Sequence, residues 1–349
     1  MESLLTIVDP DLDCDILVSQ DGSKIATGKS SGGGKIWDAI TGEMLWKIDD
    51  SHCLMGCTLS FDGTKLLKEF NDDKIQLWNI CPSTLLHTFE DISIEVPPVI
   101  FPDGNRIAYT DNGNNSKIID INQKKVLHLF VGHQESIHYL ALTPDSKIMI
   151  SSGYDFTVRA WDTDSGEMMY SIENEMACSE IVANISGNGD ILIVCLHDDS
   201  VFNIFDIYDG TLLHTFQSTI GVDTTYPSYD CNTIGVYSVL AEKVCVWDDD
   251  TDDFLSNEIN VSNSYSYPIL FDGSILCCGY MDGKISFWDI RTGILLYSFQ
   301  GYDSGSAVIG TYSLSNDRMV SVSLDNIVKV WDISDLVSGD DEYVKGKMN

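Results

Sequence analysis

With a net charge of −34, the 349-residue chain sets 54 Asp and Glu residues against only 20 Lys and Arg. Such a surface repels phosphate backbones and anionic lipids, which argues against direct binding of nucleic acid or of a membrane surface. No apolar run approaches the roughly 18 residues of a membrane-spanning helix, and the acidic first segment lacks the basic region of a signal peptide. Ten scattered cysteines indicate a reducing compartment, so we expect a cytoplasmic protein, with the nucleus as the alternative.

The elements expected along the chain repeat with a period of about 42 residues. Each period reads as an Asp-Gly-like turn, a short apolar strand, a polar turn, a strand ending at an aromatic residue before Asp, and a further strand after a Thr-Gly-like turn. These end positions lie 41 to 44 residues apart, and in chain order they are Trp37-Asp38, Trp78-Asn79, Ile119-Asp120, Trp161-Asp162, Phe205-Asp206, Trp247-Asp248, Trp288-Asp289 and Trp331-Asp332. Because no 3.6-residue apolar period is sustained, the sequence predicts an all-β repeat array with few helices.

This pattern resembles the Trp-Asp (WD) repeat family of β-propellers over nearly the whole chain. The resemblance implies four-stranded antiparallel blades around a channel. Eight matches predict a single closed propeller with eight blades, and a seven-bladed ring with one spare repeat is the alternative. Blade 3 lacks the aromatic residue, and the boundaries of repeats 3, 5 and 6 stay open.

The two ends of the repeat array predict how the ring closes. The residues after Trp331-Asp332 contain no good fourth strand, whereas an apolar strand at 4–8 precedes the first complete repeat. We therefore expect residues 4–8 to supply the outer strand of the last blade, which leaves no strand edge unpaired between the chain ends. The propeller then spans 1–335, and 336–349 form a polar C-terminal tail.

Repeat 4 matches the family best and carries its structural tetrad. The resemblance places this tetrad at His133, Ser151, Asp155 and Trp161, where hydrogen bonds satisfy a buried His and Asp. His133 and Asp155 are thus interpreted as structural and not catalytic. No other set of Ser, His, Cys and Asp has a nucleophile-like context, so we do not expect an enzyme.

Three segments imitate ligand sites. Residues 28–36 resemble a phosphate loop, but Ile36 follows the Gly34-Lys35 pair and a strand, not a helix, comes next. The run at 248–253 lacks the Gly and Glu of a calcium loop, and Cys53 and Cys57 have no second ligand pair for zinc. We therefore predict no metal and no cofactor.

The expected partner surface combines loops between blades with turns between second and third strands. The inter-blade loops carry many carboxylates and no Lys or Arg, whereas the opposite ends of the strands carry both signs. Carboxylates that converge on a channel mouth attract a basic partner. By alignment with the family, the candidate contact residues are Ser136, His138, Tyr154, Asp198, Tyr265, Met281, Leu324 and Asn71, together with the acidic Asp49, Asp50, Glu90 and Asp91.

These features favour a scaffold or escort that binds a basic protein or peptide on an acidic propeller face. One alternative is a structural subunit of a multiprotein assembly of the coat, transport or ciliary type, which would use apolar blade edges. Another is a substrate receptor of a ubiquitin ligase. That function needs an arginine cluster for phosphate, and the four arginines do not form one in the sequence.

Overall fold

The structure of the chain is a computed structural model. The structure describes residues 2–12, 16–29, 32–48, 57–70, 74–90, 96–173, 181–186, 188–196, 201–217, 224–227, 233–238, 241–248, 253–254, 259–264, 269–271, 275–290, 292–315 and 317–337. Two compact units are present, one made of Cys14–Trp37 and Met44–Gln217, the other of Met1–Asp13, Asp38–Glu43 and Ser218–Asn349.

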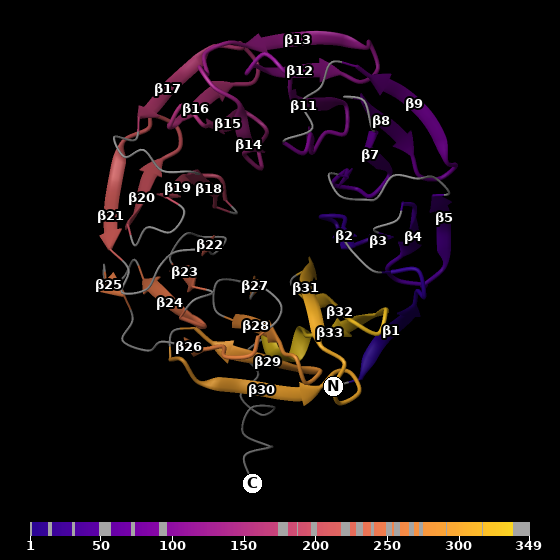
Figure 1. Ribbon diagram of the computed structural model, residues 1–349. Helices are drawn as coiled ribbons and strands as arrows, with labels where there is room; N and C mark the ends of the chain where they lie inside the picture. Colours follow the sequence, from indigo (N-terminus) through magenta and orange to yellow (C-terminus); the bar gives the residue numbers. More distant parts are fainter. Residues whose placement is uncertain are drawn as a thin grey trace. The chain divides into compact units, whose positions relative to one another are not determined.

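Five of the antiparallel sheets belong to the unit that holds most of the first 217 residues, and each sheet is one meander of four strands (Figure 1). We number the sheets as blades in chain order. Blade 1 is β2 (Ile16–Val18), β3 (Lys24–Gly28), β4 (Gly34–Asp38) and β5 (Met44–Ile48). Blade 2 is β6 (Thr58–Leu59), β7 (Lys65–Phe70), β8 (Lys74–Asn79) and β9 (Thr84–Phe89). Blade 3 is β10 (Val99–Ile100), β11 (Arg106–Thr110), β12 (Ser116–Asp120) and β13 (Lys125–Phe130). Blade 4 is β14 (Ile137–Leu142), β15 (Ile148–Gly153), β16 (Thr157–Asp162) and β17 (Met168–Glu173). Blade 5 is β18 (Ile181–Ile185), β19 (Ile191–Leu196), β20 (Val201–Asp206) and β21 (Leu212–Gln217).

The second unit holds three further sheets. Blade 6 is β22 (Thr224–Pro227), β23 (Thr233–Ser238) and β24 (Lys243–Asp248), with its outer position shared by the short strands β25 (Asp253–Phe254) and β26 (Ile259–Asn260). Blade 7 is β27 (Ile269–Phe271), β28 (Ile275–Gly279), β29 (Lys284–Asp289) and β30 (Leu295–Gln300). Blade 8 is β31 (Val308–Ser315), β32 (Arg318–Ser323) and β33 (Ile327–Asp332). A single short helix, α1 (Ser334–Val337), follows in the described part of the chain.

The outer strand of blade 8 comes from the other end of the chain. Strand β1 (Ser3–Val8) pairs antiparallel with β33, with Leu5 opposite Val330 and Val8 opposite Ile327. Figure 1 shows this pairing as an indigo strand beside a yellow one. The predicted N-terminal closing strand and the predicted eight blades are therefore confirmed. The aromatic residue missing from repeat 3 costs no strand, because Ile119 takes its place in β12 and is buried.

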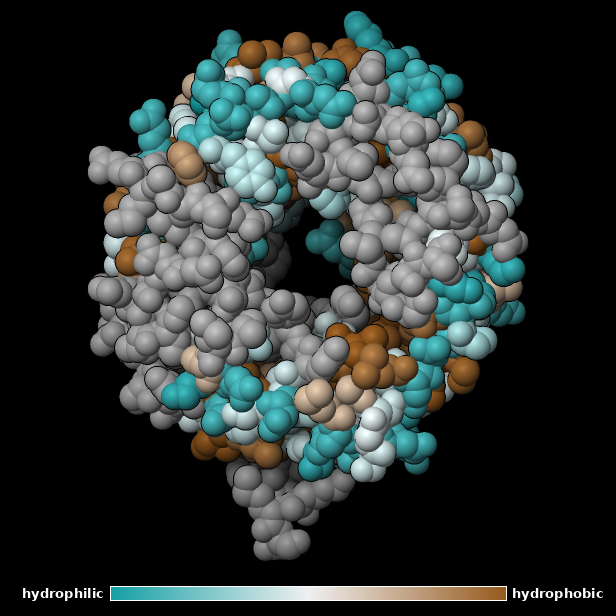
Figure 2. All heavy atoms as spheres, viewed as in Figure 1, coloured by the Kyte–Doolittle hydropathy of each residue, from teal (hydrophilic) through white to brown (hydrophobic). Residues whose placement is uncertain are grey.

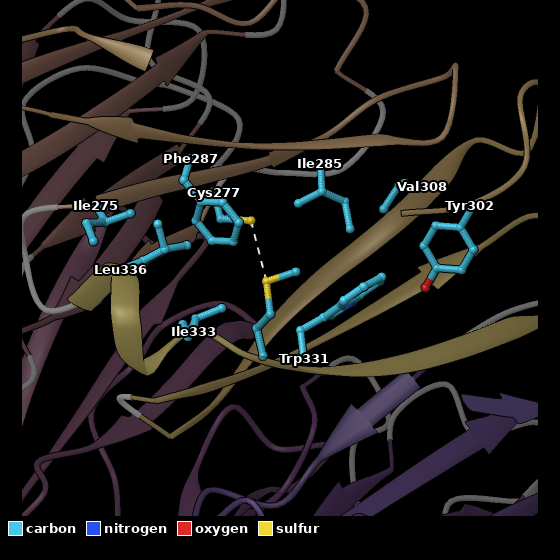
Figure 3. Packing of buried hydrophobic residues seen from close by; sticks show 10 residues of the cluster. Ile275, Cys277, Ile285, Phe287, Tyr302, Val308, Trp331, Ile333 and Leu336 are labelled. Carbon is cyan, nitrogen blue, oxygen red and sulfur yellow. Dashed lines mark hydrogen bonds between the residues drawn. The ribbon is translucent and has the colours of Figure 1, made fainter. Parts of the chain in front are cut away.

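Within each unit, the core lies between successive blades because the two faces of a strand bury side chains against different neighbours. In β29, Ile285 and Phe287 pack against blade 8, where they meet Met319 and Trp331 (Figure 3). Trp288, on the opposite face of the same strand, packs with blade 6 residues. Cys277 and Cys278 follow the same alternation, and burial raises the pKa of both thiols, which keeps them inert.

Glycines in the turn between third and fourth strands let neighbouring blades approach closely. Gly166 and Gly210 have φ of +78° and +72°. A Cβ on Gly166 would lie 2.4 Å from the His128 ring, and one on Gly210 would lie 2.6 Å from the Tyr170 ring. The Tyr170 hydroxyl also donates to the Ile207 carbonyl at 2.6 Å. A side chain of the fourth strand of one blade thus packs against the turn of the next blade. Glycine is required in this turn because φ is positive and because a Cβ would clash with that side chain.

In the residues that the structure describes, no helix is long and apolar enough to cross a membrane.

Candidate partner-binding surface

Four side chains fix the turn between β15 and β16 in blade 4. His133 Nδ1 donates to the Asp155 carboxylate at 3.0 Å, and His133 Nε2 lies 2.8 Å from Ser151 Oγ. Because the Asp155 carboxylate accepts a hydrogen bond from Nδ1–H, Nε2 of the neutral ring carries no proton and accepts a hydrogen bond from the Ser151 hydroxyl. The same oxygen accepts a bond from Trp161 Nε1 at 2.8 Å. The chain of bonds ties the loop before β14 to the inner strands and holds the turn rigid.

The order Ser-His-Asp matches a hydrolase triad, but the environment does not support nucleophilic catalysis. The exposed fraction of Ser151 is 0%, and its hydroxyl already donates to one group and accepts from another. Burial lowers the pKa of His133, although Asp155 opposes this shift, so the imidazole is neutral at pH 7. The arrangement orients a turn and offers no site for a substrate carbonyl.

Blade 8 builds the same network from different residues. Trp331 Nε1 donates to Ser321 Oγ at 2.7 Å, and the Tyr302 hydroxyl lies 2.7 Å from the same oxygen. Tyr302 therefore takes the place that His133 has in blade 4. Tyr302 was not predicted from the sequence, although Gly301-Tyr302 stands in the register of Gly132-His133. Blade 1 is simpler, because Trp37 Nε1 donates to Thr27 Oγ1 at 2.9 Å.

Blades 4, 7 and 8 each carry one exposed apolar side chain at the same position of the turn between their second and third strands. The exposed fractions of Tyr154, Met281 and Leu324 are 47%, 52% and 57%. Each backbone N–H is held by a carbonyl that precedes the first strand of its own blade: that of Ser136 for Tyr154, of Asn263 for Met281 and of Ala307 for Leu324. Figure 2 shows apolar surface in brown over the β32–β33 hairpin, whose turn carries Leu324.

In blade 4 the structure brings three of the predicted contact residues together. The Tyr154 ring stacks on the His138 ring, with centroids 4.9 Å apart and an interplanar angle of 23°. His138 Nδ1 also lies 3.1 Å from the Ser152 carbonyl oxygen. The Ser136 carbonyl accepts the Tyr154 N–H, so all three belong to one small surface at the start of β14 and the end of β15.

Among the predicted acidic residues, only Glu90 lies in the described part of the chain. Its carboxylate is 3.3 Å from the Lys74 ammonium, and the two side chains are 68% and 41% exposed. An exposed pair of this kind contributes little to stability and is readily exchanged for another cation. Asp49, Asp50, Asn71, Asp91, Asp198 and Tyr265 lie outside the described residues. Among the described residues, no group of three or more His, Cys, Asp or Glu side chains could hold a metal ion.

Comparison with known proteins follows the same repeat pattern. The family described as WD domain, G-beta repeat matches residues 124–162 and 293–332, which end at Trp161-Asp162 and Trp331-Asp332. The chain therefore contains WD repeats, and two of them match the family model. The two matched segments contain the Trp of the hydrogen-bond networks in blades 4 and 8, so the family match and the geometry agree.

Relatives of this WD-repeat protein differ widely in length. It is 24% identical to autophagy-related protein 16 of Arabidopsis thaliana over 57% of this chain and 39% of that protein. It is 21% identical to the WD repeat domain-containing protein 83 homolog of Dictyostelium discoideum, over 78% of this chain and 93% of that protein. The crystal structure of the computationally designed Ika8 protein matches with a TM-score of 0.70 at 22% identity, over 95% of this chain and 100% of that one. The chain spans less than half of the plant relative, and the likeness to Ika8 shows a shared fold.

Blade 7 of the WD-repeat protein contains a hollow of about 580 Å³ next to Met281. Trp288 and Ser286 of β29 and Leu295 of β30 line it, and Tyr280 and Asp282 border it at the β28–β29 turn. The Trp288 Nε1 donates to Ser286 Oγ at 2.9 Å, and Ser286 Oγ donates to the Tyr280 hydroxyl at 3.0 Å. The volume lies in the range of ligand-binding clefts. Nothing in the sequence pattern pointed to this hollow.

Proposed function

We propose that this protein is an interaction scaffold or escort that captures a basic protein or peptide on the face built by its inter-blade loops and second-to-third-strand turns. WD-repeat propellers serve as protein-interaction scaffolds, and the fold is generally non-catalytic. The basic character of the partner and a cytoplasmic or nuclear location are predictions.

The observation that carries the proposal is the recurrence of one exposed apolar residue at a rigid turn. The backbone N–H groups of Tyr154, Met281 and Leu324 each donate one hydrogen bond to a carbonyl of the same blade. Because each turn is fixed before a partner binds, binding costs little conformational entropy there. Exposed aromatic and methionine side chains are typical anchors of protein interfaces. The net charge of −34 adds long-range attraction for a cationic partner.

A second candidate, a structural subunit of a larger assembly, is favoured by the fourth strands. In β13 the exposed fractions of Val126, Leu127 and Leu129 are 41%, 38% and 51%. Figure 2 shows brown apolar residues along the outer edge at the top, where β13 lies in Figure 1. Exposed apolar edge strands suit a permanent neighbour that pairs with or covers them.

A receptor for phosphorylated degrons fits the described residues poorly. Arg106 lies 3.0 Å from Asp103 and 3.6 Å from Asp164, and Arg159 lies 3.7 Å from Asp155. Arginines that already face carboxylates do not cradle a phosphate.

The test is affinity capture from cell extract at low salt, followed by elution in a salt gradient and mass spectrometry. A basic partner should elute sharply as salt screens the attraction. Neutral partners that resist salt and elute as a set would overturn the escort proposal in favour of the assembly subunit.

A further inference from the structure

The position two residues before the third-strand tryptophan carries a long side chain in blades 1, 2, 4 and 8, namely Lys35, Gln76, Arg159 and Lys329. In blade 4, Arg159 Nε donates to Thr157 Oγ1 at 3.1 Å, and its guanidinium lies 3.7 Å from the Asp155 carboxylate. A Cβ placed on Gly132 would lie only 2.1 Å from this guanidinium, so Arg159 packs directly against the backbone there. We call this space, beside the glycine and the third-strand tryptophan, the groove of the blade.

Lys329 uses the same groove in blade 8. Its ammonium donates to the Gly301 carbonyl at 2.6 Å. It also lies over the Tyr302 ring at 4.6 Å and the Trp331 ring at 5.5 Å. The groove of a blade therefore binds a cationic side chain, which is stabilised by aromatic ring faces and by backbone carbonyl oxygens.

Blade 7 has the groove without the long side chain. Ser286 stands in the register of Arg159 and Lys329, and the hollow of about 580 Å³ opens above it. Trp288 stands in the register of Trp161, and Asp282 in that of Asp155. The hollow thus keeps the indole and the carboxylate that accompany Arg159 in blade 4 but offers a small hydroxyl where that side chain would begin.

The rim of the hollow is fixed before any partner arrives. The Tyr280 carbonyl accepts the Val308 N–H, and the Met281 N–H donates to the Asn263 carbonyl. Gln300 Nε2 donates to the Asp282 carbonyl at 2.7 Å. The Asp282 carboxylate is 3.0 Å from the Lys284 ammonium, but both side chains are about half exposed, so water screens this pair and a better placed cation can replace it.

We propose that the hollow in blade 7 receives an arginine side chain from the bound protein, with the guanidinium between Asp282 and the Trp288 ring and Tyr280 beside it. The inference rests on the proposed function, since it names the group through which a basic partner engages. An arginine in this place repeats, from outside the chain, the Arg159–Asp155 ion pair of blade 4 and the contact of the Lys329 ammonium with the Trp331 ring in blade 8. A planar guanidinium can bind the carboxylate and stack on the indole together, which a lysine cannot do.

The probe is a capped pentapeptide with one central arginine and glycine elsewhere, added to the whole protein. The readout is the indole N–H resonance of Trp288, assigned with the Trp288→Phe variant. The arginine peptide should shift this resonance saturably. The same peptide with citrulline, which keeps the shape and loses the charge, should bind at least about tenfold more weakly. Equal shifts by both peptides, or none by either, would overturn the assignment.

Ser286→Arg fills the hollow from within and is the decisive variant. It should abolish the arginine-peptide shift, and a cooperative thermal unfolding transition checks that the variant folds although it loses the Ser286 hydroxyl that bonds to Trp288 Nε1 and Tyr280. Gln123→Arg adds the same charge on an exposed turn of blade 3 and should bind the peptide like wild type. If Ser286→Arg does not fold, Asp282→Asn replaces it, and binding weakened by about tenfold is expected. A variant that binds as well as wild type contradicts the proposal.

The two proposals fail separately. If wild type and Ser286→Arg capture the same basic partner equally from extract, the proposed arginine-binding site in blade 7 is refuted, while the proposed scaffold for a basic partner is not. If no basic partner is captured at all, the proposed function is refuted, and the peptide titration alone decides what the hollow binds.

Discussion

Ser151→Ala tests whether the blade 4 network stabilises the fold as its geometry indicates. The substitution removes an oxygen that bonds to both His133 Nε2 and Trp161 Nε1 at 2.8 Å, where Ser151 itself has no exposed surface. Each buried polar group left without its partner costs about 1–3 kcal/mol. Because two groups lose their partner, the free energy of unfolding should fall by about 2–6 kcal/mol.

The measurement is equilibrium unfolding in urea, read from the shift of the midpoint at constant slope. Ser152→Ala is the matched control, because Ser152 is the next residue on β15 and equally buried, but its hydroxyl has only a 3.5 Å contact with His138 Nε2. This control should lose about 1 kcal/mol or less. Ser151→Thr keeps the hydroxyl, as Thr27 does in blade 1, and should restore most of the loss. Equal losses for Ser151→Ala and Ser152→Ala would refute the network as a source of stability.

Three further predictions concern stability. Burial lowers the pKa of His133 in the folded state, so His133 is protonated more readily in the unfolded state, where its pKa is about 6.5. The melting temperature should therefore fall as the pH drops through about 6.5. His133→Gln should flatten this slope, and an unchanged pH profile would contradict the assignment. Gly210→Ala should destabilise by about 1–3 kcal/mol in urea unfolding, since it combines a φ of +72° with a clash against Tyr170; a neutral result would show that the turn relaxes freely. Deletion of residues 2–9 should lower the melting temperature far more than deletion of residues 340–349, and equal effects would argue against closure through β1.

Periodic features of the fold could be predicted from sequence because period and strand register leave repeated marks. The spacing of the third-strand tryptophans and their substitutes gave the eight blades, and the apolar segment before repeat 1 gave β1. Repeat 3 could be placed without an aromatic residue because Ile119-Asp120 keeps the period of the repeat. In the structure Ile119 is buried, so its apolar side chain serves in place of the aromatic residue.

Features that depend on substitution at one position could not be predicted. Tyr302 can replace a histidine because its hydroxyl reaches Ser321 as the imidazole of His133 reaches Ser151. The repeat pattern does not predict this replacement. Lys68 holds the serine position of blade 2 in a buried site, where burial lowers its pKa to about 8. The hollow in blade 7 is lined by Ser286 at the position where blades 4 and 8 carry Arg159 and Lys329, and a smaller side chain at one position leaves no periodic signature in the sequence.

The central claim is that the carboxylates of the inter-blade loops attract a basic partner. It is tested most directly by comparing two fourfold charge reversals to lysine in the same salt-gradient capture. One carries the changes at Asp49, Asp50, Glu90 and Asp91; the other carries them at Glu43, Asp164, Glu167 and Asp335, beyond the opposite ends of the strands. Both change the net charge equally, so overall electrostatics is matched. The account predicts that the first variant releases the partner at the lowest salt and that the second retains it. Equal retention by both variants, or equal loss, would contradict the account.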